Sequence, residues 1–184
     1  MSIIFIMDSF LLELKELKGG EELEELEEEE IIYLCSKDNV VFSVLKKNAL
    51  ISKLISAFIE SDYQSGTTKE NSIKLNNVDT KCLSLIIDYM NIQKGDDENI
   101  PNFPIQSTNM EEIVENIDDA KFCNSLIISS NDGNVDLTLL FDITLASNYM
   151  DMDALLHKLC AKIATQLKEK NFEDIIKVLS SVKK

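Results

Sequence analysis

The sequence predicts an α/β fold of the α+β kind, in which a small three-stranded sheet is covered by helices. Short β-branched and aromatic runs lie between residues 31 and 75. Most of the last quarter of the chain instead carries apolar residues at helical spacing. Early strands followed by helices are typical of a sheet packed against a helical layer. Of the 184 residues, 45% are hydrophobic and 7% aromatic, which is enough to build a core.

The first two strands are predicted to form a β-hairpin. The runs Ile31–Cys35 and Val40–Val44 are rich in the β-branched and aromatic residues that favour strands. The four polar residues between them end in Asn39, which tolerates the left-handed backbone of a tight turn. After a polar loop, Ile73–Leu75 is the third predicted strand.

Helices are predicted where apolar residues recur every three or four positions. One is expected over residues 46–59, and a second begins after Asp79, a good N-cap. Asp151 or Asp153 is expected to cap the penultimate helix, and Asn171 the last one. A further helix is expected from Asp136 onward. The residues expected to face the core are Leu50, Leu54, Ile55 and Phe58 in the first helix, Leu83, Ile86, Ile87 and Met90 in the second, and Leu137, Leu140, Phe141 and Leu145 in the helix after Asp136.

Residues 1–30 are predicted to be an acidic extension of the folded domain. Its first part is expected to form a helix with one apolar stripe, made of Ile6, Phe10, Leu14 and Leu17. Eight glutamates then lie within residues 21–30, and such a run is typical of a solvated tether. Asp8 interrupts the apolar start and no basic residue precedes it, so we expect no secretory signal.

Charge and cysteine content narrow the classes of partner and the location. The formal net charge of −15 disfavours nucleic acid and favours proteins with basic docking faces. No apolar run approaches the roughly 18 residues of a membrane-spanning helix, so no membrane contact is expected. The widely spaced cysteines are expected to be buried free thiols of a cytoplasmic and nuclear protein; they are Cys35, Cys82, Cys123 and Cys160.

The sequence offers little enzyme chemistry, so we expect no catalytic residue, no metal site and no cofactor. His157 is the one histidine, and its place on an amphipathic helix is typical of a surface or boundary residue. The five glycines form no phosphate-binding loop. The carboxylates of Asp96, Asp97 and Glu98 lie in a polar stretch, where we expect them to be solvated.

The C-terminal helices carry more apolar residues than one narrow face needs. Between residues 153 and 168 these residues are Leu155, Leu156, Leu159, Cys160, Ile163, Ala164 and Leu167. Two interpretations remain open at this point. Either both helices are sunk in the core, or part of their surface binds a partner.

The segment from Leu139 to Asp151, LLFDITLASNYMD, resembles the "LFELILAANYLDI" segment of the S-phase kinase-associated (Skp) adaptor family of SCF ubiquitin ligases. The resemblance covers roughly residues 31–100 and 122–180, and its specific part is the Asn-Tyr-Met-Asp corner between two helices. It implies a BTB/POZ fold, shared with elongin C, and a helical C-terminal extension. The implied function is that of a non-enzymatic adaptor that joins a cullin to an F-box substrate receptor.

The resemblance also implies where each partner binds. In the family the Asn-Tyr corner faces the cullin, which makes Asn148 and Tyr149 the candidate cullin-binding residues. The helices after the corner hold the F-box. The candidate F-box-binding residues are Leu156, Cys160, Ile163, Leu167, Ile175 and Leu179. For each of these residues, ordinary packing is the alternative role.

The expected domain organisation has three parts, the first of which is the acidic extension of residues 1–30. Residues 31–150 form the BTB/POZ-like domain with an insertion near 105–121, and residues 151–184 form the receptor-binding helices. The family pattern continues with a helix that contains a Trp-Cys pair, whereas this sequence has no tryptophan, so these helices are expected to be truncated. Phe172 stands where the family commonly has a proline that some lineages hydroxylate.

Two alternatives keep this fold and change the partners. One is an elongin C-like adaptor whose receptors present a BC-box helix. The other is a truncated BTB protein that pairs with itself through its apolar face and has no ligase role. BTB folds often dimerise, so a homodimer is a possible assembly of this chain.

Overall fold

The computed structural model describes residues 30–129, 135–168 and 170–181, with the side chains of 129 and 177–181 excepted. The predicted N-terminal helix and tether therefore lie outside the described residues, apart from Glu30. The predicted hairpin is confirmed, because β1 (Ile31–Ser36) pairs with β2 (Val41–Leu45) in antiparallel register. Asn39 has the left-handed backbone expected of it, with φ of 61°.

The sheet has the order β2-β1-β3, and β3 (Ile73–Leu75) runs parallel to β1. A second, two-stranded sheet pairs β4 (Ile128–Ser129) with β5 (Val135–Asp136). The mixed α/β class and the three-stranded sheet are thus as predicted. The helical elements are α2 (Lys46–Ala49), α3 (Lys53–Ser61), α4 (Thr80–Gln93), the 3-10 turn η1 (Met110–Glu112), α5 (Ile117–Ser125), α6 (Thr138–Tyr149), α7 (Asp153–Leu167) and α8 (Phe172–Ser181).

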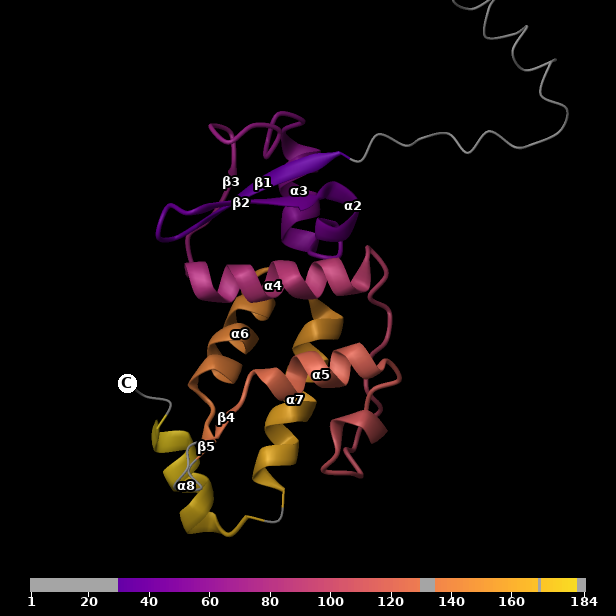
Figure 1. Cartoon of the computed structure of the whole chain (residues 1–184), viewed down its shortest axis with the longest axis vertical. Helices are drawn as coiled ribbons and strands as arrows, with labels where there is room; N and C mark the ends of the chain where they lie inside the picture. Colours follow the sequence, from indigo (N-terminus) through magenta and orange to yellow (C-terminus); the bar gives the residue numbers. More distant parts are fainter. Residues whose placement is uncertain (1–29, 130–134, 169, 182–184) are drawn as a thin grey trace, which may run out of the picture.

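The helix α4 crosses the middle of the molecule and separates two layers (Figure 1). The three-stranded sheet with α2 and α3 lies on one side of it, and α5, α6 and α7 lie on the other. The helix α8 is at the far end, beside β4 and β5. The predicted N-cap is confirmed, since Asp79 accepts a hydrogen bond from the backbone N–H of Cys82 at 2.8 Å.

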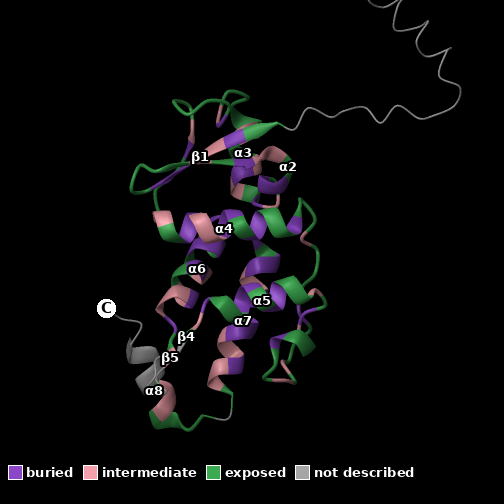
Figure 2. Cartoon of the chain, in the orientation of Figure 1, coloured by how far each residue is buried: buried purple, intermediate pink, exposed green. Residues whose placement is uncertain are grey.

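One continuous core runs through both layers (Figure 2). All four residues of α4 that were predicted to face the core are buried: Leu83, Ile86, Ile87 and Met90. Burial of that many aliphatic groups stabilises the fold at about 1.5–3 kcal/mol for each side chain. The sheet contributes Leu34 and Leu75, both fully buried, so α4 holds the sheet and the lower helices together.

The single helix predicted over 46–59 is wrong, because the chain breaks between α2 and α3. Ser52 is the N-cap of α3 and is fully buried, so a new helix begins there. This break turns part of the predicted inner face outward. Ile55 is buried as predicted, whereas Leu50 is 43% exposed and Phe58 is 37% exposed.

Four other predictions are corrected. Leu145 of α6 is 68% exposed, because the inward face of that helix is formed by Leu140, Ile143, Ala146 and Ser147. Neither Asp151 nor Asp153 caps α7, whose N-cap is Met152 with no side-chain cap. Cys160 is exposed while the other three cysteines are buried, although all four are free thiols as predicted. The cap predicted at Asn171 is confirmed, since its Oδ1 accepts from Asp174 N at 2.9 Å.

Asp97 is the fourth correction, and it concerns the segment that leads from α4 to α5. The segment begins at Gly95, whose φ is 92° and whose Cα lies so close to the chain that a Cβ would come within 2.8 Å of the Lys47 carbonyl oxygen. Glycine is therefore required there. The side chain of Asp97 was predicted to be solvated, but it is only 6% exposed.

Candidate protein-binding surfaces

The corner between α6 and α7 presents the two residues predicted to bind a cullin. Asn148 is exposed and Tyr149, the last residue of α6, is half-buried against the core. The chain reverses at Asp151, which has a left-handed φ of 53°. The turn is closed by backbone hydrogen bonds from Asp151 N to Asn148 O at 3.2 Å and from Met152 N to Ser147 O at 3.0 Å.

The start of α3 fixes this corner in place. Ser52 Oγ donates to the carbonyl oxygen of Met150 at 2.6 Å in a buried position. Lys53 N donates to Asp151 O at 3.3 Å, and the Lys53 ammonium pairs with the Asp153 carboxylate. These contacts join residues about one hundred positions apart in the chain, so the sequence alone gave no signal for them. A corner held in this way presents its exposed side chains in one geometry.

We expect Ser52→Ala to lower the free energy of unfolding by about 2 kcal/mol, because it removes both the N-cap of α3 and a buried hydrogen bond. The matched control is Ser56→Ala, whose hydroxyl bonds to Leu50 O at 3.3 Å near the surface. That change should stay within about 0.5 kcal/mol. Urea unfolding of the two variants measures the difference. Equal stability of the two would show that Ser52 does not anchor the corner.

A second surface lies along α7, where four of the six predicted F-box-binding residues share one solvent-facing stripe. The spacing of three or four residues places them on one side of the helix. Cys160 is exposed and the others are partly exposed, with Ile163 also packed against the core. We call this surface the α7 stripe; it consists of Leu156, Cys160, Ile163 and Leu167. Leu155 and Leu159, on the adjoining side of α7, are fully buried, so the apolar excess of this helix divides between core and surface.

The last helix, α8, also exposes apolar side chains. Ile175 is partly exposed, and the side chain of Leu179 lies outside the described residues. Two residues not selected from the sequence are more prominent, since Phe172 is 77% and Ile176 50% exposed. Their helical spacing of four was the signal that could have identified them.

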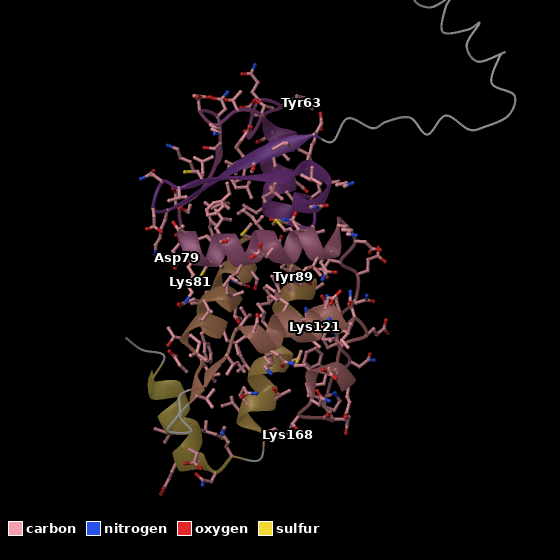
Figure 3. The ribbon with its side chains drawn as sticks, viewed as in Figure 1. Tyr63, Asp79, Lys81, Tyr89, Lys121 and Lys168 are labelled. Carbon is pink, nitrogen blue, oxygen red and sulfur yellow. The ribbon has the colours of Figure 1, made fainter. Side chains whose placement is uncertain are left out.

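Beneath the α7 stripe, a buried charge cluster ties α7 to α4 and to the segment between α4 and α5. Lys158 is fully buried, and its Nζ lies 2.7 Å from both the Asp97 and the Asp119 carboxylates. The same ammonium donates to Tyr89 OH at 2.9 Å, and that hydroxyl donates to Asp97 at 2.8 Å. Gln93 also donates to Asp119. Tyr89, which is labelled in Figure 3, belongs to α4, the helix that these contacts join to α7.

The electrostatics of this cluster are those of a structural anchor. Burial, followed by the charges of Asp97 and Asp119, raises the pKa of Tyr89 well above its usual range. Burial likewise raises the pKa of the Cys123 thiol to about 12. Both groups are therefore neutral at physiological pH, and neither is a nucleophile or a general base there.

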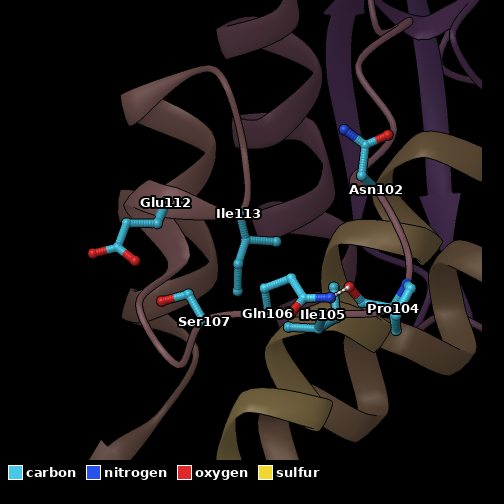
Figure 4. Close-up of a pocket in the computed structure, with 7 residues that line it drawn as sticks. All are labelled: Asn102, Pro104, Ile105, Gln106, Ser107, Glu112 and Ile113. Atoms are coloured by element: carbon cyan, nitrogen blue, oxygen red, sulfur yellow. Dashed lines mark hydrogen bonds between the residues drawn. The ribbon is translucent and has the colours of Figure 1, made fainter.

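A small surface pocket of about 230 Å³ lies in the segment between α4 and α5 (Figure 4). It is lined by Asn102, Pro104, Ile105, Gln106, Ser107, Glu112 and Ile113. Two contacts attach this segment to α7. Lys168 donates to the carbonyl oxygen of Gln106, and the rings of Phe103 and His157 lie 5.9 Å apart. This segment therefore lies against α7 near His157, the residue that follows Leu156 of the α7 stripe.

Among the described residues, no group of three or more His, Cys, Asp or Glu side chains is arranged to hold a metal ion. No helix in the described ranges has both the length and the apolarity needed to cross a membrane.

The sequence of this chain is similar to those of proteins from one known family. A family model described as "Skp1 family, tetramerisation domain" matches residues 30–95, which places the POZ domain on the sheet and α2–α4. The S-phase kinase-associated protein 1 homolog of Tetrahymena thermophila is 32% identical over 81% of each chain. The E3 ubiquitin ligase complex SCF subunit sconC of Arthroderma otae is 30% identical over 81% of each chain. The Skp1-related protein of Caenorhabditis elegans is 29% identical over 82% of this chain. The chain belongs to the Skp1 family.

Proposed function

We propose that this chain is the adaptor subunit of an SCF-type E3 ubiquitin ligase, which bridges a cullin and an F-box substrate receptor. The observation that carries the proposal is the identity of about 30% over 81% of the chain to relatives named as SCF subunits. The chain would act by scaffolding and would catalyse no step itself. Holding two partners on one rigid body raises the effective concentration of one at the other.

Asn148 and Tyr149 are our proposed cullin-binding residues. Support comes from the exposure of Asn148 and from the fixed corner, which Ser52 and Lys53 attach to α3. Leu145 lies one helical turn before Tyr149 and is 68% exposed. It adds an aliphatic contact to a polar and an aromatic one, which is the composition expected of an interface centre with a polar rim.

The α7 stripe and α8 are our proposed receptor-binding surface. A helix that is buried on one side and exposes aliphatic groups on the other suits helix-in-groove recognition. This surface runs away from the corner, along α7 and toward α8 (Figure 1). Two partners could therefore bind at the same time. The four cysteines are free thiols. We therefore further propose that the protein works in the reducing cytoplasm and nucleus.

The receptor surface is tested with Cys160→Asp, which places a charge in the middle of the α7 stripe. Because Cys160 is exposed, the substitution leaves the core intact. We expect the affinity for an F-box protein to fall by about 30-fold or more, since an unpaired carboxylate would be desolvated at the centre of an apolar contact. Calorimetric titration with an F-box protein from the same cell measures this change.

The matched control is Ser43→Asp, which adds the same charge at an exposed position of β2. It should leave F-box affinity unchanged. Cullin affinity should be the same for both variants, because neither position is at the corner. Equal F-box affinity of Cys160→Asp and wild type would place the receptor on another surface. Binding of a BC-box protein in place of an F-box protein would identify an elongin C-like adaptor.

A further inference from the structure

Three partly exposed apolar side chains lie along α3 and the turn before it, outside the two surfaces proposed above, and the middle one, Leu54, also packs against the core. Leu54 and Phe58 are one turn apart on this helix, and Leu50 precedes it in the turn after α2. Leu50 is 43% and Phe58 37% exposed, and Leu54 is partly exposed between them. We call these three residues the α3 stripe. Such a row of partly exposed side chains offers apolar area that a docking segment could cover.

Glu30, the first described residue, contacts Lys46, which precedes Leu50 of the α3 stripe by four residues. The carbonyl oxygen of Glu30 accepts from Lys46 N at 2.7 Å, and the Glu30 carboxylate lies 2.5 Å from Lys46 Nζ. Lys46 is the first residue of α2, so the described part of the chain begins beside the start of this helix. Residues 18–29 can span up to about 40 Å when extended. The nine residues of α3 cover only about 14 Å.

Charge favours the same placement. Eight glutamates lie within residues 21–30, immediately before β1. The helices α2 and α3 carry Lys46, Lys47 and Lys53. The last glutamate of the run, Glu30, forms an ion pair with Lys46. Opposite charges separated by less than about 8 Å attract at physiological salt and orient a docking segment.

The extension also has a suitable apolar face. The sequence predicts a helix with Ile6, Phe10, Leu14 and Leu17 on one side. A helix over residues 6–17 would be about 18 Å long, which is close to the length of α3 with its preceding turn. We propose that residues 6–17 dock on the α3 stripe of the same molecule, as an amphipathic helix that covers Leu50, Leu54 and Phe58.

This docking has a regulatory consequence, which rests on the proposed function. The α3 stripe adjoins the corner, because Ser52 and Lys53 at the start of α3 bind Met150 and Asp151. A segment docked there would compete with a cullin for the same side of the molecule. The affinity for the cullin should then rise when the segment is released.

Hydroxyl-radical footprinting of the full chain tests the docking without any partner. The readout is the oxidation rate of Phe58 divided by that of Phe172, which is 77% exposed and belongs to α8, the helix at the other end of the molecule. We expect this ratio to be about threefold higher in Leu14→Asp than in wild type, because the apolar segment would be released. Leu12→Asp is the matched control, since it adds the same charge on the opposite side of the predicted helix, and it should behave as wild type.

Equal ratios in all three chains would overturn the proposal. A ratio that falls as protein concentration rises would also overturn it, because the cover would then be a second copy. The proposed function is tested separately, by titrating the same chains with a cullin. Protection of Phe58 without any cullin binding would leave the docking intact and contradict the adaptor role. Cullin binding without protection of Phe58 would support the adaptor role and contradict the docking.

Discussion

Lys158→Ala is expected to lower the free energy of unfolding by about 3–5 kcal/mol, because it leaves two buried carboxylates without their cation. Lys158 is fully buried, and its ammonium pairs with Asp97 and Asp119, whose side chains are 6% and 1% exposed. For a chain of this size the loss corresponds to a fall in Tm of roughly 10 °C. Differential scanning calorimetry and urea unfolding measure it directly.

The control is Lys121→Ala, which removes an exposed ion pair with Asp118 on α5. An exposed pair of this spacing contributes at most about 0.5 kcal/mol, so the control should unfold like wild type. A second variant separates charge from packing. Lys158→Met with Asp97→Asn and Asp119→Asn removes all three charges and should be more stable than Lys158→Ala. If Lys158→Ala has the same free energy of unfolding as Lys121→Ala, the cluster does not hold α7 to α4.

The corner gives the second large effect. The double substitution Asn148→Lys/Tyr149→Lys should weaken cullin binding by about 100-fold or more, which corresponds to about 2.7 kcal/mol. It replaces an exposed amide and a half-buried aromatic ring with two cations at a single fixed turn. Calorimetric titration of the wild-type and variant chains with a cullin from the same cell measures the loss.

F-box binding by the double variant serves as the control for folding, because the α7 stripe lies on a different surface. It should stay within about threefold of wild type, as expected for distant sites that act independently. Loss of both partners would indicate a damaged fold, and Tm reports on that. Retention of cullin affinity in a well-folded variant would move the cullin to another face.

Local chemistry explains which parts of the fold could be predicted from sequence. The hairpin turn at Asn39, the cap at Asp79 and the buried face of α4 each depend on residues within one or two turns of each other. Alternation, capping and helical spacing report such relations. The family resemblance then supplied the BTB/POZ fold, which the family match over residues 30–95 supports.

Contacts between distant residues explain the errors. The helix predicted over 46–59 breaks because Ser52 bonds to Met150, which is 98 positions away. Asp97 is buried because Lys158 of α7 reaches it from 61 positions away. Neither pairing leaves a periodic signal in the sequence. For the candidate site, sequence spacing placed Leu156, Cys160, Ile163 and Leu167 on one side of α7, but it did not indicate the exposure of Leu145 or of the α3 stripe.

Simultaneous binding of a cullin and an F-box protein is the most direct test of the adaptor role. The measurement is retention of the cullin on an immobilised F-box protein, with and without this chain, followed by the mass of the eluted complex. We expect the cullin to be retained only when the chain is present, in a complex that contains one copy of each protein. If the cullin and the F-box protein displace each other from the chain, or if neither binds it, the chain is not an adaptor between them.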